Sequence, residues 1–83
     1  MRHAGDKELD QIEDLLNKIR ARKSLKEKKR GVFYKGSSAF LHFHEDSSKL
    51  FADLKIGKDW ILIPIMTRKE QNAFLKEIEK LVE

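Results

Sequence analysis

The stretch Phe40-Leu-His-Phe-His-Glu-Asp46 lies in the middle of the 83-residue chain and decides how the chain folds. Successive side chains of an extended strand point to opposite faces of a sheet, so this stretch has two distinct faces. One face holds Ala39, Leu41 and Phe43, and the other holds Phe40, His42 and His44. What covers each face depends on the segments that flank the stretch.

Three further apolar segments can pair with this central strand as an antiparallel meander. The pairs Gly36-Ser37 and Gly57-Lys58 favour tight turns, whereas Ser47-Ser48 is not a favoured hairpin turn and leaves a longer loop as an alternative. Pro64 has no N–H to donate to a ladder, so the fourth strand either lies at the edge of the sheet or ends at Pro64. The four predicted strands are 32–35, 40–46, 50–56 and 60–65.

Tight turns predict one register, because a slip by one residue would turn every core side chain outward. Across the first turn the predicted pairs are Tyr34 with Ala39, Phe33 with Phe40, and Val32 with Leu41. Across the second they are Phe43 with Ala52, Leu41 with Leu54, Ala39 with Ile56, His44 with Phe51, and His42 with Asp53. Across the third, Ile61, Ile63 and Ile65 lie beside Leu54, Ala52 and Leu50. All four strands then share one apolar face.

An amphipathic helix is predicted before the first strand. Leu9, Ile12, Leu16 and Ile19 recur at steps of three and four residues, and Asp6 is a suitable N-cap. The apolar stripe fades after Ile19. The later part of this helical region therefore projects from the core.

Acidic residues gather at the start of this helical region and basic residues at its end. The predicted basic arm comprises Arg20, Arg22, Lys23, Lys26, Lys28, Lys29 and Arg30, and Gly31 ends it. This segregation suits the helix dipole, and it also suits an arm that contacts phosphates. Both interpretations are open.

A second helix follows the strands. Thr67 and Glu70 form a capping box, and Phe74, Ile78 and Leu81 lie on one stripe. The predicted fold is a single α+β domain over 1–83, in which a four-stranded antiparallel meander (31–66) lies between an N-terminal helix (6–30) and a C-terminal helix (67–82). This α-β-β-β-β-α order favours two layers.

Two layers leave one sheet face without a helix, and that face is apolar for a solvated surface. By the registers above it carries Phe33, Phe40, His42, His44, Phe51, Asp53, Lys55, Trp60 and Leu62. The predicted contact residues for a partner or nucleic acid are Phe33, Phe40, His42, His44, Phe51, Lys55 and Trp60.

Three coverings suit this face: the first helix, a second copy of the chain in a homodimer, and single-stranded nucleic acid. In the third, bases stack on aromatic rings while Lys35, Lys55 and the basic arm meet phosphates.

Two resemblances rest on these segments. Phe40-Leu-His-Phe-His-Glu-Asp46 followed by Leu50-Phe-Ala-Asp-Leu54 resembles small uncharacterised bacterial proteins with the same strand pair, and it implies this layout only. The basic segment, the meander and the final helix, over about residues 28 to 82, resemble the single-strand-binding domain of Whirly-related transcriptional coactivators. In that family the curved sheet of a dimer holds the strand, so this resemblance implies nucleic-acid binding by the sheet.

His42 and His44 share one strand face, and Asp53 lies across from His42, so the three can converge on one metal ion. His-x-His alone is a weak signal, and few groups are at hand to orient the rings, so neither a metal nor another cofactor is expected. Asp53 should raise the pKa of His42 and make association sensitive to pH between about pH 6 and 7. His3 lies in a terminus that is expected to fray, and it is given no role.

A catalytic site is not expected. Ser37, Ser38, Ser47 and Ser48 lie in turns, where a fixed triad is hard to build, and no glycine-rich phosphate loop is present. We therefore predict a non-enzymatic module that self-associates, with single-stranded nucleic-acid binding as the alternative.

The composition of the chain restricts the cellular compartment and the partners that are expected for this module. The chain has no cysteine, which excludes disulfides and a thiolate zinc site, and its net charge of +4 favours a polyanionic partner. The longest apolar run, 60–66, is too short to span a bilayer, and the N-terminus lacks the apolar segment of a signal peptide. A cytoplasmic protein without a membrane partner is expected.

Overall fold

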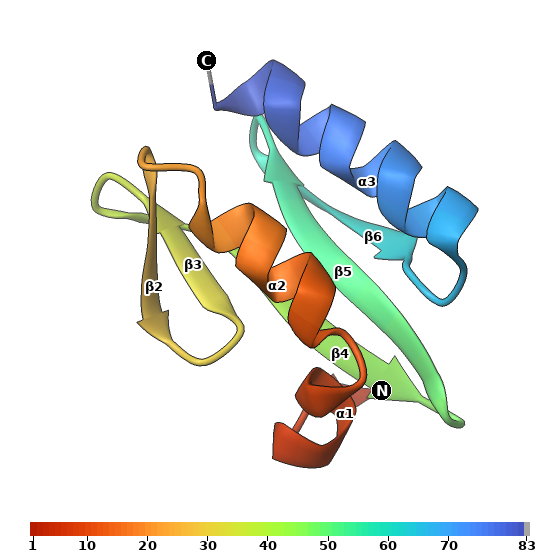
Figure 1. Cartoon of the computed structure of the whole chain (residues 1–83). Coiled ribbons are helices and arrows are strands. Elements are labelled where there is room, and N and C mark those ends of the chain that lie inside the picture. The colour runs from red at the N-terminus through yellow and green to blue at the C-terminus, as the bar shows by residue number, and fades with distance from the viewer. Residues whose placement is uncertain (83) are drawn as a thin grey trace.

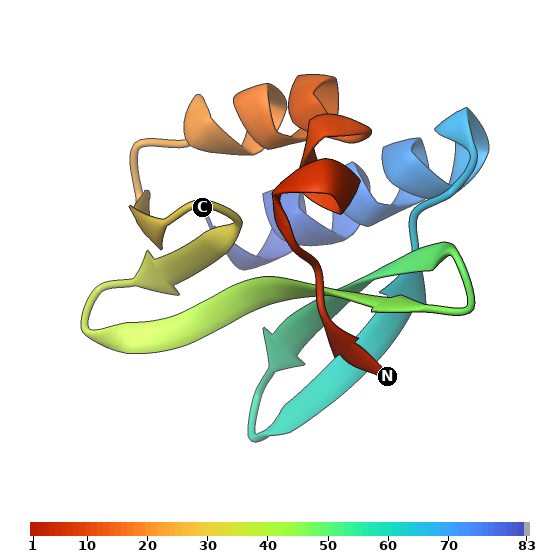
Figure 2. The ribbon, with the colours of Figure 1, turned by 90° about the horizontal axis from the view of Figure 1, so that it is seen from below.

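A computed structural model describes residues 1–82, which form an antiparallel sheet with helices packed on one of its faces (Figures 1 and 2). The five longer strands follow the order β2-β3-β4-β5-β6, and the short β1 pairs with β4. The α+β class is confirmed, whereas the prediction of four strands is wrong. The elements are β1 (Arg2–His3), α1 (Asp6–Asp10), α2 (Glu13–Arg20), β2 (Leu25–Lys29), β3 (Val32–Lys35), β4 (Ser38–Asp46), β5 (Lys49–Ile56), β6 (Asp59–Pro64) and α3 (Arg68–Leu81).

The helix predicted over 6–30 is wrong, because the chain breaks twice in that range. It first breaks between α1 and α2, where the Ile12 N–H donates to the Leu9 carbonyl at 3.1 Å. After Arg20 the chain reverses and runs back as β2, which pairs with β3 through a turn at Gly31 (φ 80°). The predicted apolar stripe still reaches the core, with Leu9, Ile12, Leu15, Leu16 and Ile19 all buried.

An additional residue in β4 changes the predicted register at its start. Tyr34 pairs with Ala39 as predicted, but the next pair is Phe33 with Leu41, so Phe40 forms a β-bulge. Phe33, Phe40 and Leu41 are then 0%, 5% and 1% exposed in the core. Burying a phenyl ring contributes about 1.5–3 kcal/mol, which favours the bulge over a regular ladder that would leave both rings outside. The prediction that Phe33 and Phe40 lie on the second face is therefore wrong.

The remaining ladders have the predicted register. His42 pairs with Asp53 and His44 with Phe51 in β4–β5, and Leu54 pairs with Ile61 in β5–β6. The β4–β5 ladder begins at Leu41, so the pair predicted between Ala39 and Ile56 is not part of it. Ser47 and Ser48 form a two-residue turn in which both have positive φ, 52° and 67°, as a type I′ turn requires.

Helix α3 covers the β5 and β6 side of the sheet. The predicted capping box is confirmed, since the Glu70 N–H donates to the Thr67 hydroxyl and the Thr67 N–H donates to the Glu70 carboxylate, both at 3.0 Å. Phe74 is fully buried and meets the Phe43 ring edge-on, with the centroids 6.3 Å apart. Helices α2 and α3 lie over the same face of the sheet (Figure 2), so the first helix does not cover the opposite face. Within residues 1–82, no helix has the length and apolarity needed to cross a membrane.

Candidate functional site

We call the sheet face opposite the helices the outer face. Apart from Phe33 and Phe40, the residues predicted for the uncovered face lie on it: His42, His44, Phe51, Asp53, Lys55, Trp60 and Leu62. The bulge also brings Tyr34 and Ala39 to this face, which the sequence pattern did not predict.

The N-terminal strand adds a residue to the outer face. β3 pairs with β4 only as far as Leu41, and β1 occupies the same edge of β4 further along, with His3 opposite His44. The Ala4 N–H donates to the Phe43 carbonyl at 3.0 Å, and Arg2 pairs with Glu45 at 2.8 Å. His3 is therefore held in the sheet, and the expectation that it lies in a frayed end is wrong.

Three imidazoles and one carboxylate converge on the outer face. The His44 Nε2 atom lies 3.2 Å from the Asp53 carboxylate, and the His42 Nε2 atom lies 3.7 Å from the same oxygen. The His3 and His44 rings stack with centroids 4.8 Å apart, and the His42 and His44 rings meet edge-on at 4.8 Å. One donor atom from each histidine lies within 4.8 Å of those of the other two. We call His3, His42, His44 and Asp53 the His–Asp cluster.

Burial favours the neutral form of His42. Its pKa is lowered from the usual value chiefly by burial, which outweighs the opposite effect of the Asp53 carboxylate, and the neighbouring imidazoles lower it further. Asp53 acts in the predicted direction, but the predicted net rise of the His42 pKa is wrong, because burial outweighs the carboxylate. The Nδ1 atoms of His42 and His44 are buried without a hydrogen-bond partner among residues 1–82. Each of these two rings thus has a polar atom that the fold leaves unused.

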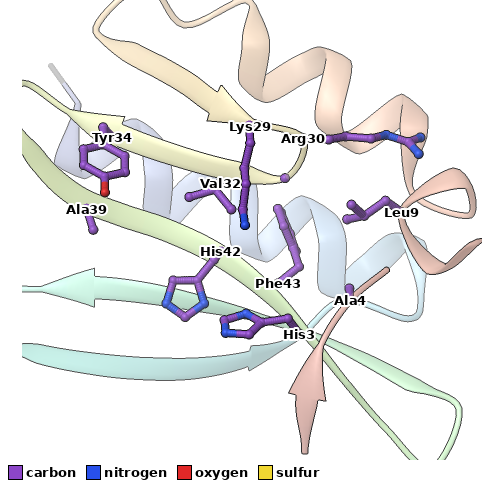
Figure 3. Close-up of a pocket in the computed structure, with 11 residues that line it drawn as sticks. His3, Ala4, Leu9, Lys29, Arg30, Val32, Tyr34, Ala39, His42 and Phe43 are labelled. Carbon is purple, nitrogen blue, oxygen red and sulfur yellow. The ribbon is translucent and has the colours of Figure 1, made fainter. Parts of the chain in front are cut away.

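A pocket of about 340 Å³ opens beside the cluster, in the gap that β1 and β3 leave along the edge of β4. His3 and His42 form one wall of it, and Lys29 and Tyr34 lie on the β2–β3 side (Figure 3). The cluster is therefore accessible from solvent through this pocket.

The predicted basic arm is divided by the fold. Its arginines are neutralised on the helix side of the sheet: Arg20 binds Glu13 and Glu27, Arg22 binds Glu79, and Arg30 binds Asp6, Asp10 and Glu13. The hydrogen bonds that Arg30 donates to Glu13, Asp10 and Asp6 raise its pKa above the usual value. The prediction of a projecting arm is wrong for these three arginines.

Lysines of β2 lie beside the outer face instead. Lys26 pairs with Tyr34 across the ladder, the Lys28 ammonium lies 5.5 Å from the Tyr34 ring centre, and Lys29 lines the pocket. At the other side of the face, the Lys55 ammonium lies 6.0 Å from the Trp60 ring. None of these four lysines takes part in the ion pairs found within residues 1–82, so their charges are free beside the outer face.

Strand β6 forms an open edge of the sheet, since it pairs only with β5. Trp60, Ile61 and Leu62 are 40%, 42% and 42% exposed, and Met66 just beyond the strand is 48% exposed. Trp60 and Leu62 belong to the outer face and Ile61 to the helix side. The edge is therefore apolar on both faces.

Comparison of the chain with protein-family models, curated proteins and solved structures gave no match. The resemblances to small bacterial proteins and to the Whirly-related domain stay predictions. The outer face and the β6 edge are therefore the surfaces that bear on function.

Proposed function

We propose that this protein is a non-enzymatic association module that forms a homodimer through β6. The observation that carries the proposal is an open edge strand with apolar side chains exposed on both of its faces. Proteins usually protect such an edge with lysines, prolines or a covering segment, because its free N–H and C=O groups template pairing with another chain. In β6, Asp59 and Pro64 stand only at the two ends and leave the apolar middle unprotected.

A second copy is the partner that this edge fits best. An antiparallel strand can pair with an identical strand about a two-fold axis, so one surface supplies both sides of the contact. A contact between two entire outer faces would bring their lysines together, whereas edge pairing keeps them apart. Lys26, Lys28 and Lys29 lie on β2, at the opposite edge of the sheet from β6.

Pro64 selects the register of this pairing. A register centred on Leu62 would set Trp60 opposite Pro64, which has no N–H to donate. A register centred on Ile61 sets Trp60 of each copy opposite Leu62 of the other, so that the backbone groups of both residues can bond. The indole then packs on the leucine across the new ladder. The two outer faces become one continuous surface with Trp60 near its middle.

The molar mass in solution tests this proposal. Light scattering after size exclusion, or sedimentation velocity over a range of concentrations, should show a dimer for the wild type and a monomer for Leu62→Lys. In the register centred on Ile61, a lysine at position 62 faces Trp60 of the other copy and brings charge into the new ladder. Lys28→Glu, which changes charge at the opposite edge, is the matched control and should stay dimeric. A monomeric wild type, or a Leu62→Lys variant with the mass of the wild type, contradicts the proposal.

A second candidate function, binding of single-stranded nucleic acid, is favoured by one observation. The unpaired lysines of β2 and Lys55 border the aromatic and imidazole rings of the outer face. Aromatic rings stack on bases of any sequence, and lysines along the border attract phosphates in a salt-dependent way. In a β6-paired dimer, two such surfaces would adjoin.

Fluorescence of Trp60, the only tryptophan of the chain, tests this candidate. Titration with a mixed-sequence single-stranded oligonucleotide should quench it saturably, more strongly at low salt than at moderate salt. Replacement of Lys26, Lys28 and Lys29 by Gln should weaken the affinity and leave the dimer mass unchanged. Arg30→Gln is the control, because that guanidinium is already bound by carboxylates. A flat titration at low salt rules out this candidate and does not affect the dimer proposal.

A further inference from the structure

We infer that His3, His42, His44 and Asp53 form a binding site for one divalent transition-metal ion of the zinc type. The fold brings these groups together from β1, β4 and β5 on the outer face. Each imidazole offers one ring nitrogen, and Asp53 offers a carboxylate oxygen.

The spacing of the donors suits a tetrahedral ion. Zinc–nitrogen bonds of about 2.0–2.1 Å place tetrahedral ligands about 3.3 Å from one another. Asp53 lies 3.2 Å and 3.7 Å from the Nε2 atoms of His44 and His42, and the three histidine donors lie within 4.8 Å of one another. His3 is the exposed member and lies on a short terminal strand, so its ring has room to turn toward the other donors.

The chemistry of the donors selects the class of ion. Three imidazoles with one carboxylate match the ligand types of zinc and neighbouring transition metals, whereas calcium and magnesium require oxygen donors almost throughout. The buried, unpartnered Nδ1 atoms of His42 and His44 show that the fold does not use up the hydrogen-bonding capacity of these rings.

The three imidazole rings lie close together, with the ring centroids of His3 and His42 5.5 Å apart and those of the other two pairs 4.8 Å apart. A bound cation would use all three lone pairs and the Asp53 charge. It would also link β1 to β4 and β5 in the middle of the sheet.

Cobalt serves as the first probe, because a bound Co²⁺ quenches a nearby indole and its tetrahedral complexes absorb visible light. The Trp60 ring lies 4.7 Å from the His42 ring, so it reports binding directly. Titration of the untagged full chain should quench Trp60 at one equivalent per chain, and Zn²⁺ should displace the cobalt and restore the fluorescence. Saturating Zn²⁺ should also raise the midpoint of thermal unfolding.

Variants separate this site from adventitious binding. His3→Gln and Asp53→Asn should each weaken Zn²⁺ affinity by roughly 10–100-fold or more. Asp46→Asn is the matched control, since Asp46 is an exposed carboxylate at the end of the same strand pair and should leave the affinity unchanged.

Two results would overturn the inference. One is no saturable quenching of the wild type by Co²⁺ and no change of its thermal midpoint with Zn²⁺. The other is an unaltered Zn²⁺ affinity in both His3→Gln and Asp53→Asn, with far-ultraviolet circular dichroism showing both variants folded. Because His3 is exposed and its replacement removes no core contact, that variant keeps the test decisive even if Asp53→Asn fails to fold.

Discussion

At the scale of single residues, the bulge residue Phe40 determines which aromatic side chains belong to the core. By standing outside the ladder it lets Phe33 pair with Leu41, and both phenyl rings turn toward the helices. Phe51, which the ladder places opposite His44, stays on the outer face and is half-buried there. Core rings and outer-face rings should therefore contribute differently to stability.

Phe33→Ala should lower the free energy of unfolding by about 3–5 kcal/mol, because the ring is fully buried and its removal leaves a cavity. Phe51→Ala should cost clearly less, since its half-buried ring leaves no closed cavity. Urea denaturation followed by circular dichroism measures both. If Phe33→Ala does not fold, Phe33→Leu, with an expected cost of about 1.5 kcal/mol or less, gives a measurable value. Equal losses for Phe33→Ala and Phe51→Ala would contradict this assignment of faces.

At the scale of elements, the sequence pattern was sufficient to predict those strands that bury every second residue as an apolar side chain. The registers of β4–β5 and β5–β6 followed from the pattern, because a slip would expose Leu54 and its neighbours. The register of β3–β4 could not be predicted in this way. A bulge leaves one residue unpaired, and the alternation of apolar and polar residues in the sequence does not show where it occurs. Of the residues predicted for the second sheet face, all except Phe33 and Phe40 accordingly lie on it.

Strands β1 and β2 escaped prediction for a different reason. β2 buries only Leu25 and directs Glu27 toward Arg20, so its alternation is mostly one of charged residues and reads as a solvated helix end. β1 is two residues long and is recognisable only through its partner strand. No local pattern in residues 1–6 marked His3 as part of the sheet. Its place beside His44 depends on chain reversal, which local pattern does not encode.

At the scale of the whole molecule, the acidic and basic residues that are separated along the N-terminal third of the sequence come together because the chain folds back on itself. The early acids of α1 and α2 meet the late bases of α2 and the β2–β3 turn, with Arg30 bound to Asp6 at 3.0 Å and to Asp10 at 2.7 Å. The separation of charges along the sequence therefore serves ion pairs within the fold. It does not only complement a helix dipole, and it does not leave the arginines free to contact phosphates. It also explains why lysines, and not arginines, carry the free charge near the outer face.

Glu27 is the most enclosed carboxylate of this network. It accepts hydrogen bonds from Arg20 at 2.6 Å and 3.0 Å and from the Gly31 N–H at 2.9 Å. Burial raises the pKa of Glu27, but these hydrogen bonds and the Arg20 charge outweigh burial and hold the pKa below its usual value. A pKa lowered by folding contributes stability above the unfolded value of about 4.3, and this contribution is lost as the pH falls through the lower folded value.

Glu27→Gln should therefore lower the free energy of unfolding by about 1–2 kcal/mol at pH 7, because the amide cannot replace the charged bonds to Arg20. The same variant should lose less stability than the wild type when the pH falls from about 5 to 3, because it lacks the carboxyl group whose protonation is linked to unfolding. Urea midpoints measured at several pH values test both effects. Glu77→Gln is the control, because Glu77 forms an exposed pair with Lys80 on α3 and should change neither quantity measurably. A Glu27→Gln variant with the acid sensitivity of the wild type would show that other carboxylates link folding to pH.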